Sequence, residues 1–102
     1  MIMGFAMQDG DDPKEELSKV LASIQDTDEM LSFLRDLCSP QELTAMAERW
    51  RIVNLVDAGI AYRQIGTQIG ASTATITRVA RALGEGSGYR TVLDSMTGQA
   101  NE

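Results

Sequence analysis

Four hydroxyl side chains and two arginines gather within ten residues of the chain, shortly after a glycine. They are Ser72, Thr73, Thr75, Thr77, Arg78 and Arg81. Hydroxyl and guanidinium groups hydrogen-bond to the base edges and phosphates of double-stranded DNA. Threonine is a weaker helix former than alanine or leucine, so its clustering on a short helix indicates a requirement other than folding. The chemistry that this set predicts is binding to a nucleic acid.

A helix drawn from Ser72 to Leu83 separates these side chains into two faces. The apolar face contains Ile76, Val79, Ala80 and Leu83. The polar face contains Ala74, Thr77, Arg78 and Arg81. Ser72 is predicted to cap the helix, and the first turn behind it has exposed N–H groups and a positive dipole end that favour a phosphate. Small side chains near this end would let the helix approach bases in a major groove about 12 Å wide, while the arginines further along hold phosphates.

The residues before this helix predict that it is the second helix of a helix-turn-helix unit spanning residues 61–83. Ile65 and Ile69 point inward from the first helix of the unit. Gly66 is a small residue that would allow the two helices to cross closely. Gly70 supplies the positive φ that a short turn requires, because a side chain there would be strained. Each demanding position of the unit therefore holds a residue type that fits.

Charge is distributed unevenly along the chain. The net charge is −6, and residues 1–57 hold twelve acidic and five basic side chains. Residues 58–84 hold three arginines (Arg63, Arg78 and Arg81) and no acidic residue. Because the local field matters more than net charge to a phosphate partner, this segment is where DNA is expected to bind. Two alternatives stay open from charge alone: the arginines form a solvated helix face, or the unit docks on a protein of the transcription machinery without reading DNA.

Composition excludes several kinds of site. The chain has no histidine and a single cysteine, Cys38, so zinc sites and histidine-based catalytic triads are excluded. No acid/base constellation is evident, and we expect neither enzyme activity nor a bound metal or cofactor. A lone cysteine indicates a reducing compartment, and no apolar run approaches the roughly 20 residues needed to cross a bilayer. We therefore expect a cytoplasmic protein without a membrane segment.

Both ends of the sequence predict helices, and no segment shows convincing strand alternation. Helical periodicity begins at Pro13, and Thr27 is expected to cap a second helix. A last short helix, at about residues 89–96, offers three apolar side chains for docking. They are Val92, Leu93 and Met96. The predicted organisation is a disordered tail at residues 1–12, a single all-α domain at residues 13–97 and a second tail at residues 98–102.

The segment SPQEL predicts the start of the longest helix. Ser39 is a good N-cap, Pro40 suits the first helical position, and Glu42 completes a capping box. The helix is expected to run to about Ala58 and to end at Gly59 in the left-handed conformation. Its apolar side chains are spread widely around the helix, as in a central strut that is shared with a partner chain.

Three segments of the chain carry a family resemblance: RWRIV, AGIAYRQIG and GASTATITRVARAL. They resemble the Trp repressor superfamily, in particular its short YerC/YecD-type branch, and the match extends from about Leu37 to Leu83. The resemblance implies an intertwined, all-helical homodimer that represses transcription by binding double-stranded DNA. It also implies that Arg63, Thr73, Ala74 and Thr77 lie near the bases, with many contacts made through water as in the Trp repressor.

The polar face and the resemblance together predict seven DNA-binding residues. They are Arg63, Ser72, Thr73, Ala74, Thr77, Arg78 and Arg81. The two-fold symmetry of a homodimer would place two recognition helices about 34–36 Å apart, one turn of DNA, so we expect a near-palindromic operator.

The resemblance also marks positions where some family members bind L-tryptophan. The two arginines that hold the indole match Arg49 and Arg78, and further pocket positions match Ser39 and Thr75. This chain departs from that pattern, because the pocket glycine is Val79 and a pocket serine is Ala82. An isopropyl group at position 79 would occupy space that the indole ring needs. We therefore expect neither L-tryptophan nor another amino-acid effector to bind.

Overall fold

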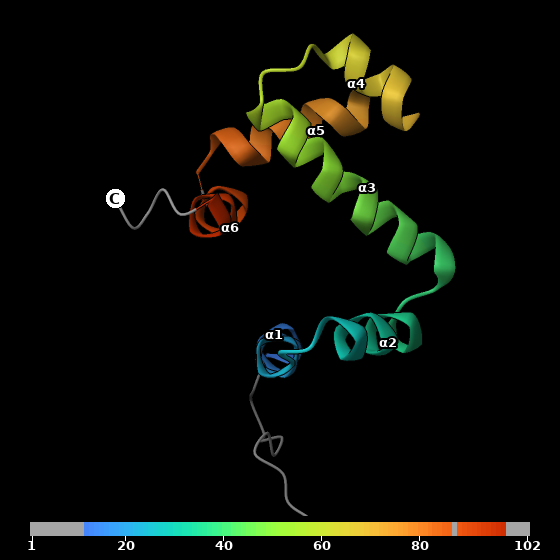
Figure 1. Ribbon diagram of the computed structural model, residues 1–102, viewed down its shortest axis with the longest axis vertical. Helices are drawn as coiled ribbons and strands as arrows, with labels where there is room; N and C mark the ends of the chain where they lie inside the picture. Colours follow the sequence, from blue (N-terminus) through green and yellow to red (C-terminus); the bar gives the residue numbers. More distant parts are fainter. Residues whose placement is uncertain (1–11, 87, 98–102) are drawn as a thin grey trace, which may run out of the picture. The chain divides into compact units, whose positions relative to one another are not determined.

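The computed structural model describes residues 12–86 and 88–97, and within these ranges every regular element is a helix. The helices, labelled in Figure 1, are α1 (Pro13–Ser23), α2 (Thr27–Leu37), α3 (Pro40–Asp57), α4 (Tyr62–Ile69), α5 (Thr73–Gly84) and α6 (Gly88–Thr97). The prediction of an all-α fold is confirmed. No helix in the described part of the chain is long and apolar enough to cross a membrane. The chain divides into two compact units, Met1–Pro40 and Gln41–Glu102.

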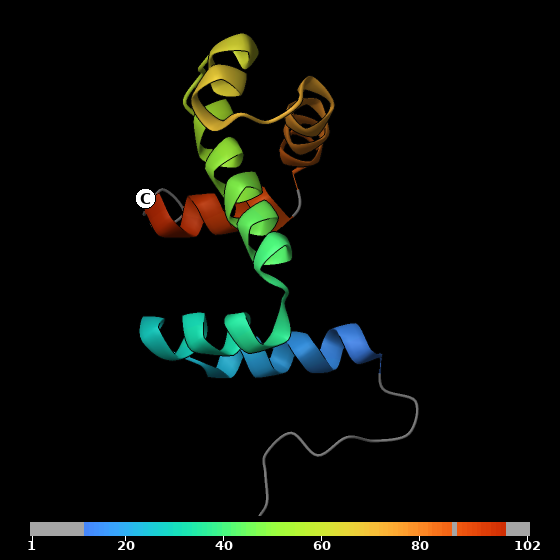
Figure 2. The ribbon, with the colours of Figure 1, turned by 90° about the vertical axis from the view of Figure 1, so that its right-hand side faces the viewer.

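The N-terminal unit contains α1 and α2, and the chain reverses direction between them (Figure 2). Asp12, which the sequence placed in the tail, instead caps α1 by accepting a 2.9 Å hydrogen bond from the Lys14 N–H. The predicted cap of α2 was wrong by one residue. Asp26 is the cap and accepts a 3.0 Å hydrogen bond from the Glu29 N–H, while Thr27 is the first helical residue. A carboxylate one position earlier reaches the third N–H group, so the threonine is not needed there.

Neither α1 nor α2 has a buried residue. Their large apolar side chains include Leu17, Leu31 and Leu37, all of which are exposed. Of the predicted tails at residues 1–12 and 98–102, residues 1–11 and 98–102 lie outside the described residues, and the extent of the domain stays a prediction.

Helix α3 begins at Pro40, as predicted, and its last residue is Asp57, one before the expected end. The capping box of Ser39 and Glu42 stays a prediction. Gly59 has φ +84°, as expected of a residue that ends a helix in the left-handed conformation. Its N–H donates to the Val56 carbonyl at 3.0 Å, and the Ile60 N–H donates to the Leu55 carbonyl at 3.1 Å. These two bonds form a Schellman motif, which satisfies carbonyls that the end of the helix leaves unpaired.

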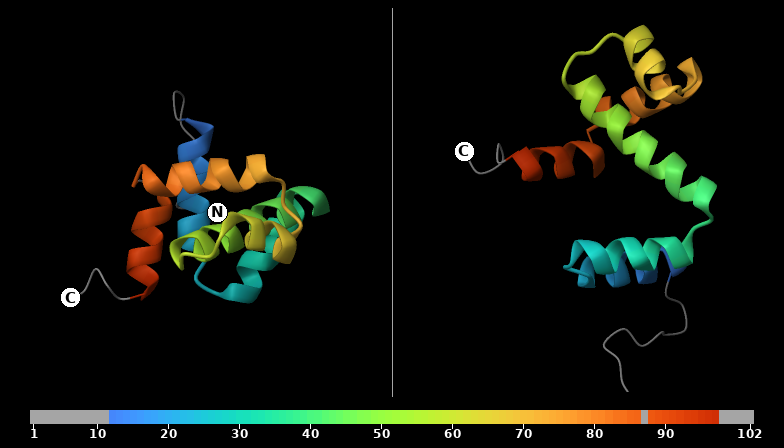
Figure 3. Two further views of the ribbon diagram at one scale, coloured as in Figure 1. Left: turned by 90° about the horizontal axis from the view of Figure 1, so that it is seen from above. Right: turned by 45° about the vertical axis from the view of Figure 1, so that its right-hand side comes forward.

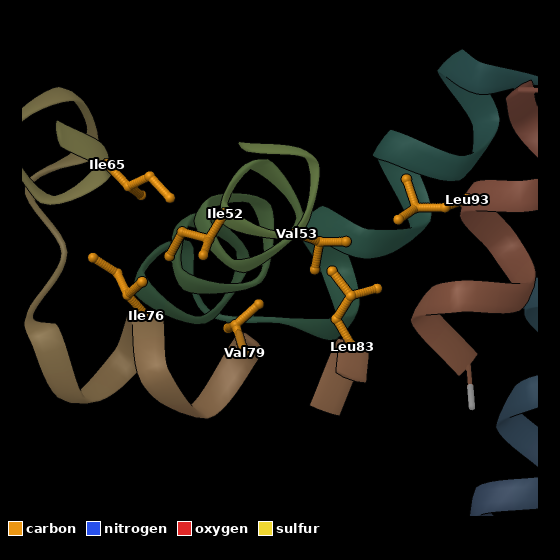
Figure 4. Packing of buried hydrophobic residues seen from close by; sticks show 7 residues of the cluster. All are labelled: Ile52, Val53, Ile65, Ile76, Val79, Leu83 and Leu93. Carbon is orange, nitrogen blue, oxygen red and sulfur yellow. The ribbon is translucent and has the colours of Figure 1, made fainter. Parts of the chain in front are cut away.

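A row of seven buried apolar side chains forms the core of the C-terminal unit (Figure 4). They are Ile52, Val53, Ile65, Ile76, Val79, Leu83 and Leu93. Side chains of α3 and α5 face each other along this row, with α4 at one end and α6 at the other. Ile52 and Val53 are fully buried, although sequence reasoning gave weight to the wider apolar surface of α3 and did not single out Ile52.

Helix α6 docks on this core differently from the prediction. Leu93 is buried, but Val92 and Met96 are 46% and 71% exposed. In their place the ring of Tyr89 packs beside Trp50 of α3, with 6.3 Å between the ring centroids. The four apolar side chains of α6 recur with helical spacing, yet only the half of that stripe nearest α3 and α5 is covered.

Candidate nucleic-acid interface

The turn between α4 and α5 has the geometry that the sequence predicted. Gly70 ends α4 with φ +83° and ψ 15°, and its N–H donates to the Gly66 carbonyl at 2.8 Å. Ile65 of α4 is fully buried and Ile69 is partly buried against the same core. The two helices pack against each other across this turn (Figure 3), as expected of a helix-turn-helix unit at residues 61–83.

Gly66 does not have the role that the sequence assigned to it. A Cβ added at this position would lie 3.5 Å from the Ala71 carbonyl oxygen and 3.7 Å from Cδ1 of Ile76. Both distances are ordinary van der Waals contacts, so α4 and α5 leave room for an alanine. The close approach of the two helices therefore does not require a glycine.

Two of the four hydroxyls near the start of α5 are used to build the helix. Ser72 is the N-cap, and its Oγ accepts a 3.1 Å hydrogen bond from the Thr75 N–H. The same Oγ lies 3.0 Å from Thr75 Oγ1, so the two hydroxyls also share a hydrogen bond. The predicted capping role of Ser72 is confirmed. Thr75 is half-buried, in contrast to Thr73 and Thr77, which are exposed.

The outer face of α5 is exposed along its whole length. Ile76, Val79 and Leu83 are buried in the core, so the opposite side of the helix faces away from the domain. The predicted DNA-binding residues of α5 are all exposed: Thr73, Ala74, Thr77, Arg78 and Arg81. The N-cap Ser72 and Arg63 of α4 are exposed as well. The structure therefore brings the seven residues to the exposed surface of the helix-turn-helix unit.

This surface is basic. Within the described residues, the side chains of Arg63, Arg78 and Arg81 form no ion pair with a carboxylate. Residues 58–84 contain no acidic side chain with which these arginines could pair. Their positive charges are therefore directed to solvent, where an anionic partner can approach.

Sequence reasoning overlooked the polar surface of α4 beyond Arg63. Gln64 and Gln68 are exposed one turn apart on this helix, and glutamine amides can bond bidentately to adenine in the major groove. The polar residues between the inward-pointing isoleucines could have indicated them. Thr67 is exposed too, but its hydroxyl donates to the Arg63 carbonyl at 3.1 Å and is used within the helix.

The positions that match a tryptophan pocket do not present a set of free polar groups. Ser39 belongs to the N-terminal unit, whereas Arg49, Thr75 and Arg78 belong to the C-terminal unit. Arg49 is half-buried, the Thr75 hydroxyl is hydrogen-bonded to Ser72, and Arg78 is exposed. Val79 is 2% exposed, with its isopropyl group inside the core (Figure 4).

Within residues 12–86 and 88–97, no group of three or more histidine, cysteine or acidic side chains is arranged to hold a metal ion. The fold and this surface define an all-helical protein built around a helix-turn-helix. The model of the Trp repressor protein family matches residues 14–97, and the chain belongs to that family.

Two known proteins refine this assignment. The chain is 37% identical over 81 residues to the uncharacterized protein YerC of Bacillus subtilis (strain 168), with 78% of each protein aligned. It also superimposes on the crystal structure of a TrpR like protein from Eubacterium eligens ATCC 27750, with a TM-score of 0.76 and 33% sequence identity. That match covers 81% of this chain and 87% of the other. The resemblance to YerC-type, Trp-repressor-like proteins is therefore confirmed, and so is the fold.

Proposed function

We propose that the protein is a sequence-specific transcription regulator, acting as a repressor, that inserts α5 into the major groove of double-stranded DNA. The observation that carries this proposal is the contrast between the two sides of α5. Ile76, Val79 and Leu83 are buried, while the hydroxyl and guanidinium side chains on the other side are exposed and basic. Membership of the Trp repressor family supports it, since the Trp repressor reads DNA with the second helix of a helix-turn-helix.

The proposed regulator acts as a homodimer in the cytoplasm. Support for a dimer comes from the family and from α1 and α2, which have no buried residue although each has apolar side chains at helical spacing. Leu17, Leu31 and Leu37 are exposed in the single chain, and apolar surface of this kind is stabilised by burial against a second subunit. We propose no catalytic activity, cofactor or metal for this protein.

Thr77 and Arg63 are proposed to discriminate between base pairs. The variant Thr77→Ala with Arg63→Ala should lose its operator preference while staying folded, because both side chains are exposed. Each lost base contact is expected to cost about 1–3 kcal/mol of discrimination. Lys19→Ala with Thr91→Ala is the matched control, since it removes one cation and one hydroxyl from exposed positions outside the interface. Full sequence preference in the first variant, measured by titration against operator and scrambled DNA, would contradict this interface.

The operator should be found by selection from random double-stranded DNA. A short, near-palindromic motif is the expected result, and binding should weaken steeply with salt because phosphate contacts supply much of the affinity. Genomic pull-down separates this function from the alternative, a module that docks on the transcription machinery. Protein partners without an enriched DNA motif would support the alternative.

The selection should be repeated with L-tryptophan and other amino acids. Val79 fills the position where an indole ring would need empty volume, and Thr75 is engaged by Ser72. We therefore propose that the operator is bound equally well with and without an amino acid. A change of tenfold or more in affinity on adding one of them would contradict this.

A further inference from the structure

Arg90 joins α6 to the end of α3. Its Nη2 atom lies 2.7 Å from Oδ1 of Asp57, and its Nη1 atom lies 3.2 Å from Oδ1 of Asp94 on the same helix. The bond to Asp57 spans 33 positions of the sequence. Two hydrogen bonds raise the pKa of Arg90 above its ordinary value; the bond to Asp57 has the larger effect and the bond to Asp94 the smaller. The guanidinium is therefore charged and held between two carboxylates.

Asp57 destabilises the helix to which it belongs. It is the last residue of α3, where the partial negative charge of the helix dipole disfavours a carboxylate. The last turn of α3 contains no basic side chain to offset this. The compensating charge comes from Arg90, so the acid at this position is explained by a contact with α6 and not by the stability of α3.

Helix α6 contacts both α3 and α5, and the angle between these two helices sets the direction of α5. It packs against α5, and its Leu93 shares the buried core with Val53 of α3 and Leu83 of α5. The rings of Tyr89 and Trp50, which are tilted by 45° to each other, add a second contact with α3. Because the Arg90–Asp57 pair fastens α6 to the end of α3, it braces α5 against α3 from the side opposite α4.

We propose that Arg90 is a positioning residue for DNA binding: by fastening α6 to Asp57 it fixes the angle at which α5 presents its outer face. This inference rests on the proposed function. Arg90 does not contact DNA itself in this proposal, because both of its terminal nitrogens are engaged by carboxylates. Arg90 instead raises the fraction of molecules in which α5 is correctly directed. When that fraction falls, the apparent affinity for DNA falls in proportion.

The expected effect is modest. The Arg90 and Asp57 side chains are 38% and 35% exposed, so water and salt weaken their attraction. Breaking the pair should lower the operator affinity by about two- to fivefold, with little change in overall fold, because Leu93 and Tyr89 still hold α6 on the core.

Two variants test the proposal because they change the net charge in opposite directions. Arg90→Gln removes a positive charge and Asp57→Ala removes a negative one. Attraction of DNA by net charge alone predicts weaker binding for the first and tighter binding for the second. The proposal predicts weaker binding for both, and the double variant should be no worse than either single variant, because all three lack the same contact. Glu85→Ala is the control: it removes an exposed acid beside α6 and should not weaken binding.

Salt dependence separates positioning from contact. Operator binding by fluorescence anisotropy at several salt concentrations gives the slope of log affinity against log salt. Arg81→Gln, which removes a proposed phosphate contact, should reduce that slope by about one. Arg90→Gln should reduce the slope by much less than one, because salt screening of a single partly exposed ion pair changes the affinity only slightly. A slope reduced by about one for Arg90→Gln would mean that it touches a phosphate, and tighter binding by Asp57→Ala would mean that charge alone matters; either result would overturn the proposal.

Hydrogen exchange without DNA makes the outcome independent of the proposed function. The amides of α6 should exchange about two- to fivefold faster in Asp57→Ala and Arg90→Gln than in the wild type or Glu85→Ala. Unchanged exchange would overturn the role of the ion pair even if DNA binds as proposed. Faster exchange in a protein that binds no DNA sequence selectively would refute the proposed function and retain the ion pair as a brace of α6.

Discussion

Replacing Gly70 by alanine should destabilise the protein, whereas replacing Gly66 by alanine should stabilise it. The two glycines lie four residues apart in one helix-turn-helix, and they differ in backbone conformation. Gly70 has φ +83° and nothing within 4 Å of an added Cβ. The whole cost at this position therefore comes from the left-handed backbone, which is about 1–2 kcal/mol for a residue with a Cβ. The reduced freedom of alanine in the unfolded chain offsets part of this cost.

Gly66 lies within α4, and an added Cβ would make ordinary contacts at 3.5 and 3.7 Å. Alanine is favoured over glycine inside a helix by up to about 1 kcal/mol. Gly66→Ala should therefore raise the free energy of unfolding by about 0.5–1 kcal/mol. The midpoints of thermal unfolding of the two variants should differ by about 10 °C, given roughly 4–8 °C per kcal/mol for a domain of this size.

Urea and thermal unfolding followed by circular dichroism would measure both effects. The protein concentration must be held equal, because the stability of a dimer depends on it. Gly59→Ala repeats the Gly70 experiment at the end of α3, where φ is +84° and nothing lies within 4 Å of the added Cβ. It should cost as much as Gly70→Ala. A loss of stability in Gly66→Ala comparable to that in Gly70→Ala would show that α4 and α5 lie closer together than in the structure. It would refute the conclusion that there is room for a Cβ at position 66.

Two further predictions concern the cap and the core. Ser72→Ala removes the acceptor for the Thr75 N–H and should lower the free energy of unfolding, measured by urea unfolding, by about 1 kcal/mol. Thr75→Val keeps that N–H and should lower the free energy of unfolding by less. A larger loss for Thr75→Val than for Ser72→Ala would contradict the capping role. Ile52→Ala should lower it by about 2–5 kcal/mol because the side chain is fully buried among α4 and α5. Asn54→Ala on the same helix is its exposed control, and equal losses in the two would place Ile52 outside the core.

The sequence predicts those parts of the fold whose cause is local. The positive φ of Gly59 and Gly70 and the cap at Ser72 each depend on residues within one turn of the chain. They were predicted because glycine and serine supply a backbone freedom and a hydrogen bond that few other residues supply. The cap of α2 was misplaced because Asp26 and Thr27 are both good caps, and only the geometry shows which side chain reaches the Glu29 N–H.

The parts that the sequence did not predict depend on distant contacts. Periodicity identifies the apolar stripe of α6 but does not show how much of it α3 and α5 cover, and Val92 and Met96 stay exposed in the single chain. The pairing of Arg90 with Asp57 spans 33 positions and has no local signal. The hydroxyls of α5 show the same limit: four look alike in the sequence, yet those of Ser72 and Thr75 bond to each other at the cap, whereas Thr73 and Thr77 are exposed along the helix.

The C-terminal end of α5 depends on an ion pair as well as on apolar contacts, and this affects how the proposed regulator can respond to its surroundings. Ile76 and Val79 fix the first part of α5 in the apolar core. Near its end, Leu83 belongs to the same core, and α5 is also braced by α6, which is fastened to α3 through a partly exposed ion pair. A change in salt weakens an exposed ion pair but acts little on a buried apolar contact. We therefore expect solution conditions to act on α5 through α6, which contains Arg90 and packs against α5, and not through the position that Val79 occupies.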